Sequence, residues 1–328
     1  MIRLGIIGAG YIASLIARTI RMMRESGIDR VELYGVASRS GEKARAFAAE
    51  YGAAKYFASY EALVADTSVD LVYIATPHSH HAEHIRLCLE GGKHVLCEKA
   101  FTANAAEAKL LVELAREKKL LLAEAIWTRY QPMRSIIDDT LASKIAGEAK
   151  MLTANLSYNI LHKERIVKPE LAGGALLDVG IYALNFAEMI FGHPDEVYAV
   201  CQKNAAGVDI HDSITLVYGK SGRTAILAAG ADAISDRYGM IYCTDGFIQI
   251  ENINNPQKIS VFNKERALIK ETACPAQLTG YEYELIETAD TIEAGKIECP
   301  SMPLSETVHM MELMDEIRKL YGVRYPFE

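Results

Sequence analysis

The stretch GAGYIA, residues 8–13, follows the apolar run Arg3–Ile7 and opens an amphipathic segment. Its G-x-G-x-x-A pattern lies between a strand and a helix, where the first glycine permits a tight turn. The second glycine lets a pyrophosphate approach the backbone, and the small alanine lets helix and strand pack closely. The helix N-terminus adds N–H donors and a positive dipole. The pattern therefore predicts a dinucleotide cradle made by Gly8, Gly10, Tyr11, Ile12 and Ala13.

Around this cradle, residues 1–126 alternate short apolar runs with amphipathic stretches. Several runs are apolar at successive positions, as strands covered on both faces must be. Between them lie helical patterns such as Ala105–Lys118. The alternation predicts an α/β Rossmann domain over residues 1–126, with a doubly wound parallel sheet. Its predicted strands are Arg3–Ile7, Val31–Ala37, Lys55–Phe57, Val69–Ala75, His94–Glu98 and Leu120–Ile126.

After about residue 145 the pattern becomes that of an α+β domain with a mostly antiparallel sheet, assigned to residues 127–328. The predicted strands are Ala149–Tyr158, Glu196–Gln202, Asp212–Tyr218, Thr224–Ala229, Gly239–Cys243, Phe247–Glu251 and Lys258–Asn263. The predicted helices are Gly174–Phe191, Tyr281–Ala294 and Glu306–Tyr321, and the last of these is able to pack back on the first domain. The run Thr224–Ala229 has apolar residues at both odd and even positions, so both faces of this strand should be covered. One face can pack on the domain's helices, and the other is expected to meet a second subunit. We expect a homodimer or homotetramer formed through this sheet.

The composition and charge of the chain argue against some classes of partner. The net charge is −8 and no cluster of basic residues is long enough to follow a phosphate backbone, which argues against nucleic acid as a partner. No apolar run reaches membrane-spanning length, so no membrane partner is expected. The six cysteines are widely separated and form no C-x-x-C pair, which favours reduced thiols and a cytoplasmic protein.

The end of the second predicted strand indicates which dinucleotide binds. Enzymes that use NAD normally carry Asp or Glu there, to bind the ribose 2′-hydroxyl. Here Ser38, Arg39 and Ser40 follow the strand, while Asp29 and Glu32 lie at its other end. A guanidinium beside two hydroxyls suits a 2′-phosphate. We therefore expect NADP(H) to be preferred, with NAD(H) possible.

Parallel strands joined by right-handed crossovers place their C-terminal ends on one edge of the sheet. Three further groups of candidate residues follow strands and should share that edge: Thr76, Pro77, His78 and His81; Glu98 and Lys99; Trp127 and Arg129. A zinc site in the histidine run 78–84 is disfavoured, because adjacent histidines diverge at a helix start and no acidic or cysteine partner is suitably spaced. No metal is expected, and His81 is the candidate for the nicotinamide edge.

In the second domain, GGALLDVGIY, residues 173–182, opens a helix. Asp178 and Tyr182 are four residues apart, which places them on one face of an α-helix. Gly180 inside that helix costs about 1 kcal/mol relative to alanine, which is understandable if something must approach the backbone closely. Taken alone, the stretch fits a purely structural role equally well, with Asp178 as a carboxylate favoured by the helix dipole and Tyr182 as an aromatic residue of the core.

In this order, GAGYIA, TPHSHH, CEKAF, AEAIWTRY and GGALLDVGIY resemble the Gfo/Idh/MocA oxidoreductases. EAIWTR and GGALLDVGIYALN are most similar to the branch of dihydrodiol dehydrogenases and NADP-dependent xylose dehydrogenases. The resemblance spans essentially the whole chain and implies a Rossmann domain followed by an open-faced sheet domain. The family's E-K-P motif falls on Glu98-Lys99-Ala100, with alanine in place of proline, and implies that Lys99 is catalytic. The resemblance also implies site roles for His81, Asp178 and Tyr182.

The resemblance implies reversible hydride transfer between NADP(H) and a secondary alcohol or anomeric carbon of a sugar, polyol or trans-dihydrodiol. Either Tyr182, assisted by the Lys99 ammonium, or Lys99 itself accepts the hydroxyl proton. Asp178 holds a substrate hydroxyl or orients Tyr182, and Tyr158 lines the pocket mouth together with Asn159, His162 and Lys163. Two alternatives stay open: a non-catalytic NADP(H)-binding regulatory protein, and a redox-neutral lyase or glycosidase that retains its cofactor.

Overall fold

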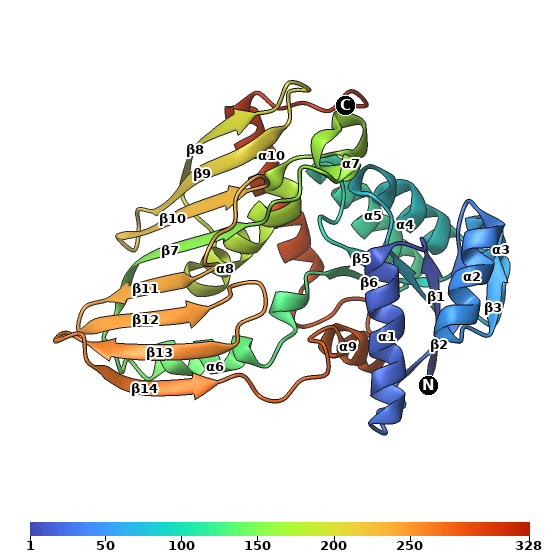
Figure 1. Cartoon of the computed structure of the whole chain (residues 1–328), viewed down its shortest axis with the longest axis horizontal. Coiled ribbons are helices and arrows are strands. Elements are labelled where there is room, and N and C mark those ends of the chain that lie inside the picture. The colour runs from blue at the N-terminus through green and yellow to red at the C-terminus, as the bar shows by residue number, and fades with distance from the viewer. The chain divides into compact units, whose positions relative to one another are not determined.

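The computed structural model describes residues 1–328, which divide into two compact units (Figure 1). Unit 1 comprises Met1–Tyr130 and Gln277–Met311, and unit 2 comprises Gln131–Ala276 and Glu312–Glu328. The first boundary lies within four residues of the predicted one at 126. The segment 277–311, however, was assigned to the second domain and belongs to unit 1.

The reason for this difference is a set of contacts that sequence periodicity does not show. Arg30, just before the second strand, forms ion pairs with Asp290 and Glu293 of the returning segment. The backbone N–H of Leu122 also donates to the carbonyl of Ile297 at 3.1 Å. These contacts join the returning helix to the parallel sheet.

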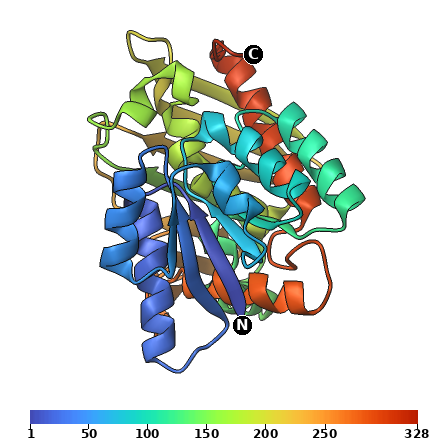
Figure 2. The ribbon, with the colours of Figure 1, turned by 90° about the vertical axis from the view of Figure 1, so that its right-hand side faces the viewer.

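Unit 1 contains a six-stranded sheet in the order β3-β2-β1-β4-β5-β6, with every pair parallel. The strands are β1 (Ile2–Ile7), β2 (Val31–Ala37), β3 (Lys55–Phe57), β4 (Leu71–Ile74), β5 (His94–Glu98) and β6 (Leu122–Ala125). The helices are α1 (Tyr11–Glu25), α2 (Gly41–Tyr51), α3 (Tyr60–Ala65), α4 (His81–Glu90), α5 (Ala105–Lys118), α9 (Glu282–Glu293) and the start of α10 (Leu304–Tyr321). Figure 2 shows α1 and α2 on one side of this sheet and α4 and α5 on the other.

The six predicted strands of unit 1 are confirmed, and the physical reason is burial on both faces. Leu4, Ile6 and Ile7 of β1 are each fully buried, as are all four residues of β4. Local caps begin the helices between them. Ser40 accepts from the N–H of Lys43 at α2, and Asn104 accepts from the N–H of Glu107 at α5.

Unit 2 contains an eight-stranded sheet in the order β14-β13-β12-β11-β7-β10-β9-β8, in which only β7 and β10 pair in parallel. Its strands are β7 (Ala149–Ser157), β8 (Glu196–Lys203), β9 (Asp209–Tyr218), β10 (Arg223–Gly230), β11 (Gly239–Cys243), β12 (Gly246–Glu251), β13 (Lys258–Asn263) and β14 (Leu268–Ala273). Its helical elements are α6 (Met133–Ala142), α7 (Glu164–Val167), η3 (Pro169–Leu171), η4 (Leu176–Gly180), α8 (Ile181–Phe191) and the end of α10. The sequence did not predict the edge strand β14, which is largely exposed and has no alternating apolar pattern.

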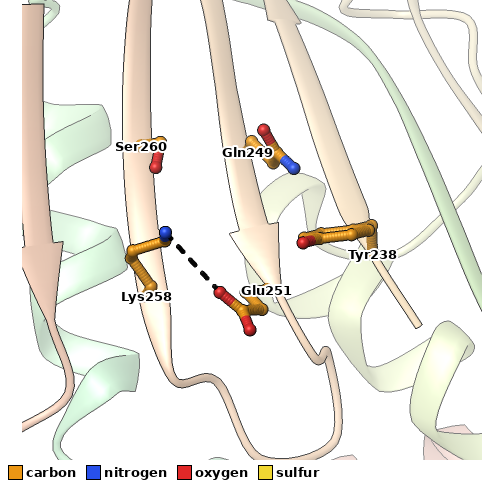
Figure 3. A pocket seen from close by; sticks show the side chains of 5 residues that line it. All are labelled: Tyr238, Gln249, Glu251, Lys258 and Ser260. Atoms are coloured by element: carbon orange, nitrogen blue, oxygen red, sulfur yellow. Dashed lines mark ion pairs between the residues drawn. The ribbon is translucent and has the colours of Figure 1, made fainter. Parts of the chain in front are cut away.

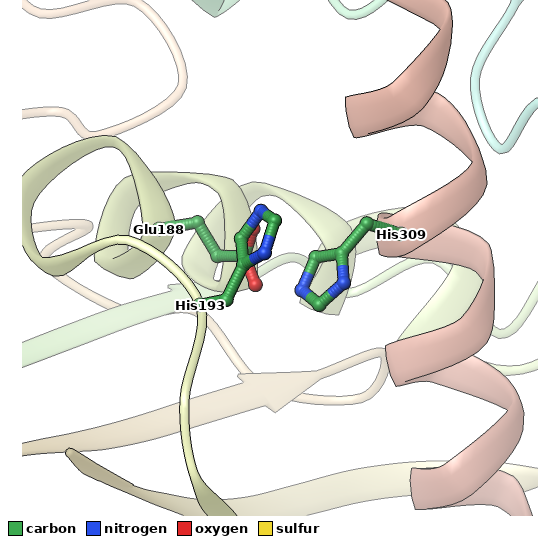
Figure 4. A group of neighbouring side chains, drawn as sticks. All are labelled: Glu188, His193 and His309. Atoms are coloured by element: carbon green, nitrogen blue, oxygen red, sulfur yellow. The ribbon is translucent and has the colours of Figure 1, made fainter.

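One face of this sheet packs on α8, which contacts β7 and β10. The segment Pro169–Phe191 is long and apolar enough to cross a membrane by length and composition, but 83% of its most apolar window is buried inside the protein. It therefore serves as the core helix of unit 2. Near its end, the carboxylate of buried Glu188 lies 3.8 Å from Nε2 of His193 (Figure 4).

The other face of the sheet carries an apolar row, five side chains aligned by strand register: Met151, Tyr242, Phe247, Phe262 and Leu268. The rings of Phe247 and Phe262 stack with centroids 4.6 Å apart. A small polar pocket beside this row is lined by Tyr238, Gln249, Glu251, Lys258 and Ser260 (Figure 3). Within it, Glu251 and Lys258 form an ion pair at 3.8 Å.

Candidate active site

The turn after β1 has the geometry that a dinucleotide cradle requires. Gly8 has φ of +105°, and a Cβ there would lie 2.8 Å from the carbonyl oxygen of Ala75, so only glycine fits. A Cβ on Gly10 would meet nothing within 4 Å, which leaves space beside the backbone. Gly10 also precedes α1, whose first N–H groups receive no side-chain cap. These groups, with Tyr11 and Ile12 in the first turn, fit the pyrophosphate of a dinucleotide.

The segment after β2 offers donors but no carboxylate. Ser38 Oγ accepts from the N–H of Ser40 at 3.3 Å, and Ser40 Oγ accepts from the N–H of Lys43. Because both hydroxyl oxygens act as acceptors here, their own protons remain available to a phosphate. Arg39 between them is exposed to solvent. This arrangement fits a 2′-phosphate better than a 2′-hydroxyl, which needs an acceptor.

The loop after β4 is tied to the segment after β5 by one histidine. His81 is fully buried, and its ring nitrogens lie 2.7 Å from the carbonyl oxygen of Thr76 and 2.8 Å from that of Ala100. Burial lowers the pKa of His81 to about 4, although both carbonyls favour a protonated ring. A neutral imidazole carries one N–H and donates to one of the two carbonyls. The structure thus gives His81 a bracing role, and its contact with a nicotinamide stays a prediction.

The other residues of this loop pack around His81 and its neighbour His84. Thr76 Oγ1 lies 2.9 Å from Nδ1 of His84, and Pro77 precedes the short helix η1 (His78–His80). The ring of His78 meets that of His81 edge-on, with centroids 5.7 Å apart. The histidines that suggested a metal site from sequence therefore pack against one another and against the loop.

Glu98, at the end of β5, is held from inside unit 1. Its Oε1 accepts a 2.5 Å hydrogen bond from the hydroxyl of Tyr73, which also lies 3.4 Å from Oε1 of Glu284 on α9. Burial, together with the charge of Glu98, raises the pKa of Glu284 well above its usual value. The Tyr73 hydroxyl therefore donates mainly to the Glu98 carboxylate and also lies within hydrogen-bonding distance of Glu284. This chain explains how a buried strand ends in a charged residue.

Lys99 follows directly and is half-buried. The Lys99–Ala100 peptide, where the family motif has proline, is cis. The ammonium of Lys99 is close enough to two buried groups of unit 1 to affect both. It adds to the burial that lowers the pKa of His81, and it opposes the burial that raises the pKa of Glu124.

Glu124 is a buried carboxyl that sequence reasoning overlooked. It lies on β6, aligned with Cys97 of β5, and is 1% exposed. Burial raises the pKa of Glu124 to about 7, a rise opposed by the charges of Arg129 and Lys99. At neutral pH, a carboxyl group with this pKa is ionised in only a fraction of the protein molecules. The sequence did contain a clue, since a carboxylate stands inside an otherwise apolar strand.

The residues after β6 pack against the returning segment of unit 1. Arg129 is 9% exposed and its guanidinium lies 3.4 Å from Glu306 Oε2. Trp127 stacks on Tyr281 with ring centroids 4.4 Å apart and an interplanar angle of 17°. The predicted place of Trp127 and Arg129 at the cofactor edge of the sheet stays a prediction.

In unit 2, the predicted helix over Gly174–Phe191 begins differently from a regular α-helix. Residues Leu176–Gly180 form a π-helical turn, and α8 continues from Ile181. Such turns occur frequently at functional sites. Asp178 lies in this turn, is 4% exposed, and accepts a 2.5 Å hydrogen bond from Arg165 of α7. Because α7 is only four residues long, periodicity could not identify Arg165 as the partner of Asp178.

Tyr182 lies in the first turn of α8 and is 9% exposed. Gly180 just before it packs closely, because a Cβ there would lie 3.2 Å from Leu176 Cδ1. Tyr158 follows β7 and has the guanidinium of Arg237 5.8 Å from its ring centroid. Asn159, His162 and Lys163 are exposed. Unit 2 thus carries the residues predicted to bind substrate, as unit 1 carries those predicted to bind the cofactor.

Comparison with known proteins agrees with this architecture. Residues 2–125 match the model of an oxidoreductase family with an NAD-binding Rossmann fold, and residues 134–249 match the GFO/IDH/MocA C-terminal domain. Human trans-1,2-dihydrobenzene-1,2-diol dehydrogenase is 31% identical over 350 residues, covering 99% of this chain and 98% of that protein. The enzyme of the same name from Xenopus tropicalis is 34% identical over 303 residues, covering 90% and 91%.

Among solved structures, a 3-ketoreductase from Actinomadura kijaniata in complex with NADP and TDP-benzene superposes with a TM-score of 0.88 at 25% identity, covering 98% of each chain. An aldose-aldose oxidoreductase from Caulobacter crescentus shares the fold, with a TM-score of 0.86 at 21% identity over 98% and 97% of the two chains. The predicted fold class, family and enzyme class are confirmed. The chain is an NAD(P)-dependent dehydrogenase that acts on CH–OH groups, and it belongs to the GFO/IDH/MocA family of oxidoreductases.

Proposed function

We propose that the protein oxidises one carbon of a vicinal diol, in a trans-dihydrodiol or a sugar, with NADP⁺ as the preferred acceptor. The observation that carries the proposal is the shared sheet edge of unit 1, where the cradle of Gly8–Ala13 follows β1 and Lys99 follows β5, two parallel strands separated by β4. The names of the relatives support the substrate class, since they act on a trans-diol of dihydrobenzene.

The preference for NADP⁺ rests on Arg39 and on the absence of a carboxylate at the end of β2. When bound, the nicotinamide would supply the hydride acceptor. The residues proposed to hold the cofactor are those of the cradle, of the segment after β2 and of the later strand ends. They are Gly8, Gly10, Tyr11, Ile12, Ala13, Ser38, Arg39, Thr76, Pro77, His78, His81, Glu98, Lys99, Trp127 and Arg129.

The proton chemistry is assigned to Lys99 and Tyr182. As the alcohol is oxidised, its hydroxyl proton must pass to a base. Tyr182 can take it with an ammonium nearby to stabilise the phenolate, or Lys99 can take it as the neutral amine. We propose that Asp178 binds a substrate hydroxyl, oriented by its hydrogen bond from Arg165. Tyr158 would cover the mouth of the substrate site.

The test is a substrate screen followed by absorbance at the NADPH band. Purified protein is incubated with NADP⁺ or NAD⁺ and with trans-dihydrodiols, aldoses or polyols. NADPH formation with a vicinal diol, and a lower KM for NADP⁺ than for NAD⁺, is the expected result. Product formation without net NADPH would favour the redox-neutral lyase or glycosidase. Cofactor binding without turnover of any compound would contradict the proposed activity.

We also propose that the apolar row of unit 2 is covered by a second copy of the chain. Beside the row, Ile226 is 48% exposed, Tyr198 60% and Val200 70%, on the face opposite α8. A sheet face of this kind is self-complementary and suits an isologous interface. A cytoplasmic location remains our expectation, in keeping with six cysteines that lie far apart in the sequence.

Light scattering coupled to size-exclusion chromatography tests the assembly. Ile226→Asp places a charge on the proposed interface and should convert a dimer or tetramer to smaller species. Ile234→Asp is the matched control, because Ile234 is 84% exposed in a loop outside the sheet. A wild-type protein that elutes as a monomer at micromolar concentration would contradict the proposal.

A further inference from the structure

The turn that leads into η4 is fixed by contacts on several sides. The N–H of Gly173 donates to the carbonyl of Lys168 at 3.1 Å, and the N–H of Gly174 donates to that of Ile166 at 2.9 Å. Gly174 has φ of +126°, which disfavours other residues there. The chain is therefore held in one conformation just before the turn that carries Asp178.

A buried carboxylate holds the start of the helix itself. Asp209, the first residue of β9, is fully buried, and its Oδ2 accepts a 2.6 Å hydrogen bond from the N–H of Leu176. A Cβ on Gly174 would lie 2.3 Å from Asp209 Oδ1, so the carboxylate occupies the space that the missing side chain leaves. A negative charge at this end also interacts favourably with the helix dipole. Leu176 opens the continuous helical segment that contains Asp178 and Tyr182.

The C-terminal segment supplies the opposite contact on the same turn. The hydroxyl of Tyr325, a residue only 1% exposed, donates to the carbonyl of Gly173 at 2.8 Å. Tyr325 lies under the guanidinium of Arg318, 4.6 Å from its ring centroid. Arg318 in turn pairs with Glu328 at 2.8 Å. The turn is thus held through an N–H on one side and a carbonyl on the other.

A second buried carboxyl lies on the same strand as Asp209 and influences its charge. Asp212, also on β9, is 2% exposed. Burial and the charge of Asp209 raise the pKa of Asp212 well above its usual value. Burial also raises the pKa of Asp209, but hydrogen bonds from the backbone N–H groups of Leu176 and Ala175 oppose that rise. Asp209, which accepts the hydrogen bond from Leu176, is therefore the member of the pair whose charged form the helix start favours.

We propose that Asp209 is a positioning residue for the reaction, which fixes the helix start so that Asp178 and Tyr182 are held in their reactive arrangement. The inference rests on the proposed function, because it assigns a purpose to the placement of those two side chains. A carboxylate buried without a formal ion pair is costly, and a neutral side chain would cap the helix at lower cost. Catalytic groups, in contrast, lose activity steeply when they are displaced by about 1 Å.

The experiment compares Asp209→Asn with Asp212→Asn. Asp209→Asn keeps the size and one acceptor oxygen but removes the charge, and should lower kcat by about 10- to 100-fold, as expected for a small displacement of reacting groups. The KM for NADP⁺ should stay within about twofold, because the cradle belongs to unit 1. Asp212→Asn changes the neighbouring buried carboxyl of β9, whereas the N–H of Leu176 bonds to Asp209, and it should keep the wild-type kcat. Amide hydrogen exchange over residues 174–182 should become faster in Asp209→Asn only.

The outcomes separate this inference from the proposed function. If the wild-type protein binds NADP⁺ but oxidises no alcohol, the proposed function fails. If the wild-type protein is active and Asp209→Asn has the wild-type kcat, even with a lower melting temperature, Asp209 has only a structural role and the inference is overturned. Should Asp209→Asn not fold, Tyr325→Phe decides in its place. A reduced kcat with unchanged KM for NADP⁺ supports the inference, and an unchanged kcat overturns it.

Discussion

The two units hold their functional side chains by different means. In unit 1 each predicted group follows a parallel strand, so the order and direction of the strands bring the groups to one edge. In unit 2, Asp178 and Tyr182 lie on a helix whose start is fixed by partners far away in the chain. Asp209 lies 33 positions from Leu176, and Tyr325 lies 152 positions from Gly173. A site at strand ends is thus determined by topology, whereas a site at a helix start depends on specific distant contacts.

The largest expected effect tests the strand-end site directly. Lys99→Met removes the ammonium and should lower kcat by about 1,000-fold, within the range for loss of a group that handles a proton. NADP⁺ binding should weaken far less than kcat falls, because Lys99 is one of many proposed cofactor contacts and the cradle is untouched. Stopped-flow kinetics and calorimetric titration measure the two quantities, and Lys118→Met on the exposed end of α5 is the control. Normal turnover by Lys99→Met would show that the strand-end charge is not catalytic.

The second effect concerns the brace at the same edge. The folded pKa of His81, about 4, lies below its ordinary value of 6.5, so the folded state favours the neutral ring. Its contribution to stability is complete above pH 6.5 and is lost as the pH falls toward 4. The loss is on the order of 3 kcal/mol, from 1.36 kcal/mol per pH unit. Urea denaturation at pH 7 and pH 4 measures it, and His81→Gln should show a smaller acid loss. An equal acid loss in His81→Gln would place its origin elsewhere.

A third test examines the hydrogen-bond chain behind Glu98. Tyr73→Phe leaves the carboxyls of Glu98 and Glu284 without their shared hydroxyl, in a buried site. The free energy of unfolding should fall by about 1–3 kcal/mol, the usual cost of an unsatisfied buried polar group. Tyr56→Phe is the control, since Tyr56 is 51% exposed at the edge of the same unit. Equal stability of Tyr73→Phe and the wild-type protein would argue that this chain does not support the strand end.

The smallest effect tests cofactor choice. Arg39→Ala should raise the KM for NADP⁺ by about tenfold, corresponding to loss of one charge-assisted hydrogen bond of about 1.4 kcal/mol. The KM for NAD⁺, which has no 2′-phosphate, should stay the same. Arg21→Ala on the exposed surface of α1 serves as the matched control. A parallel rise in both KM values would show that Arg39 does not read the 2′-phosphate.

The sequence predicted the fold class, all six parallel strands and seven of the strands in unit 2. The edge strand β14 was missed because exposure on most of its length removes the apolar alternation. The segment 277–311 lies in unit 1 because of contacts with Arg30 and with the backbone of Leu122, which the sequence pattern does not show. Periodicity records which face of an element is apolar, but not which other element covers that face.

The candidate site likewise has features that the sequence predicts and features that only the tertiary structure decides. The sequence itself determines three features: the glycine spacing, the missing carboxylate after β2, and the order of strands and helices. Each of these follows from backbone geometry or from local chemistry. The partners of the charged groups are decided only by tertiary structure. Glu284 reaches Tyr73, Arg165 reaches Asp178, and Asp209 reaches Leu176 across long stretches of chain. A buried charge is stabilised by whichever group folding brings beside it, and that neighbour has no fixed spacing in the sequence.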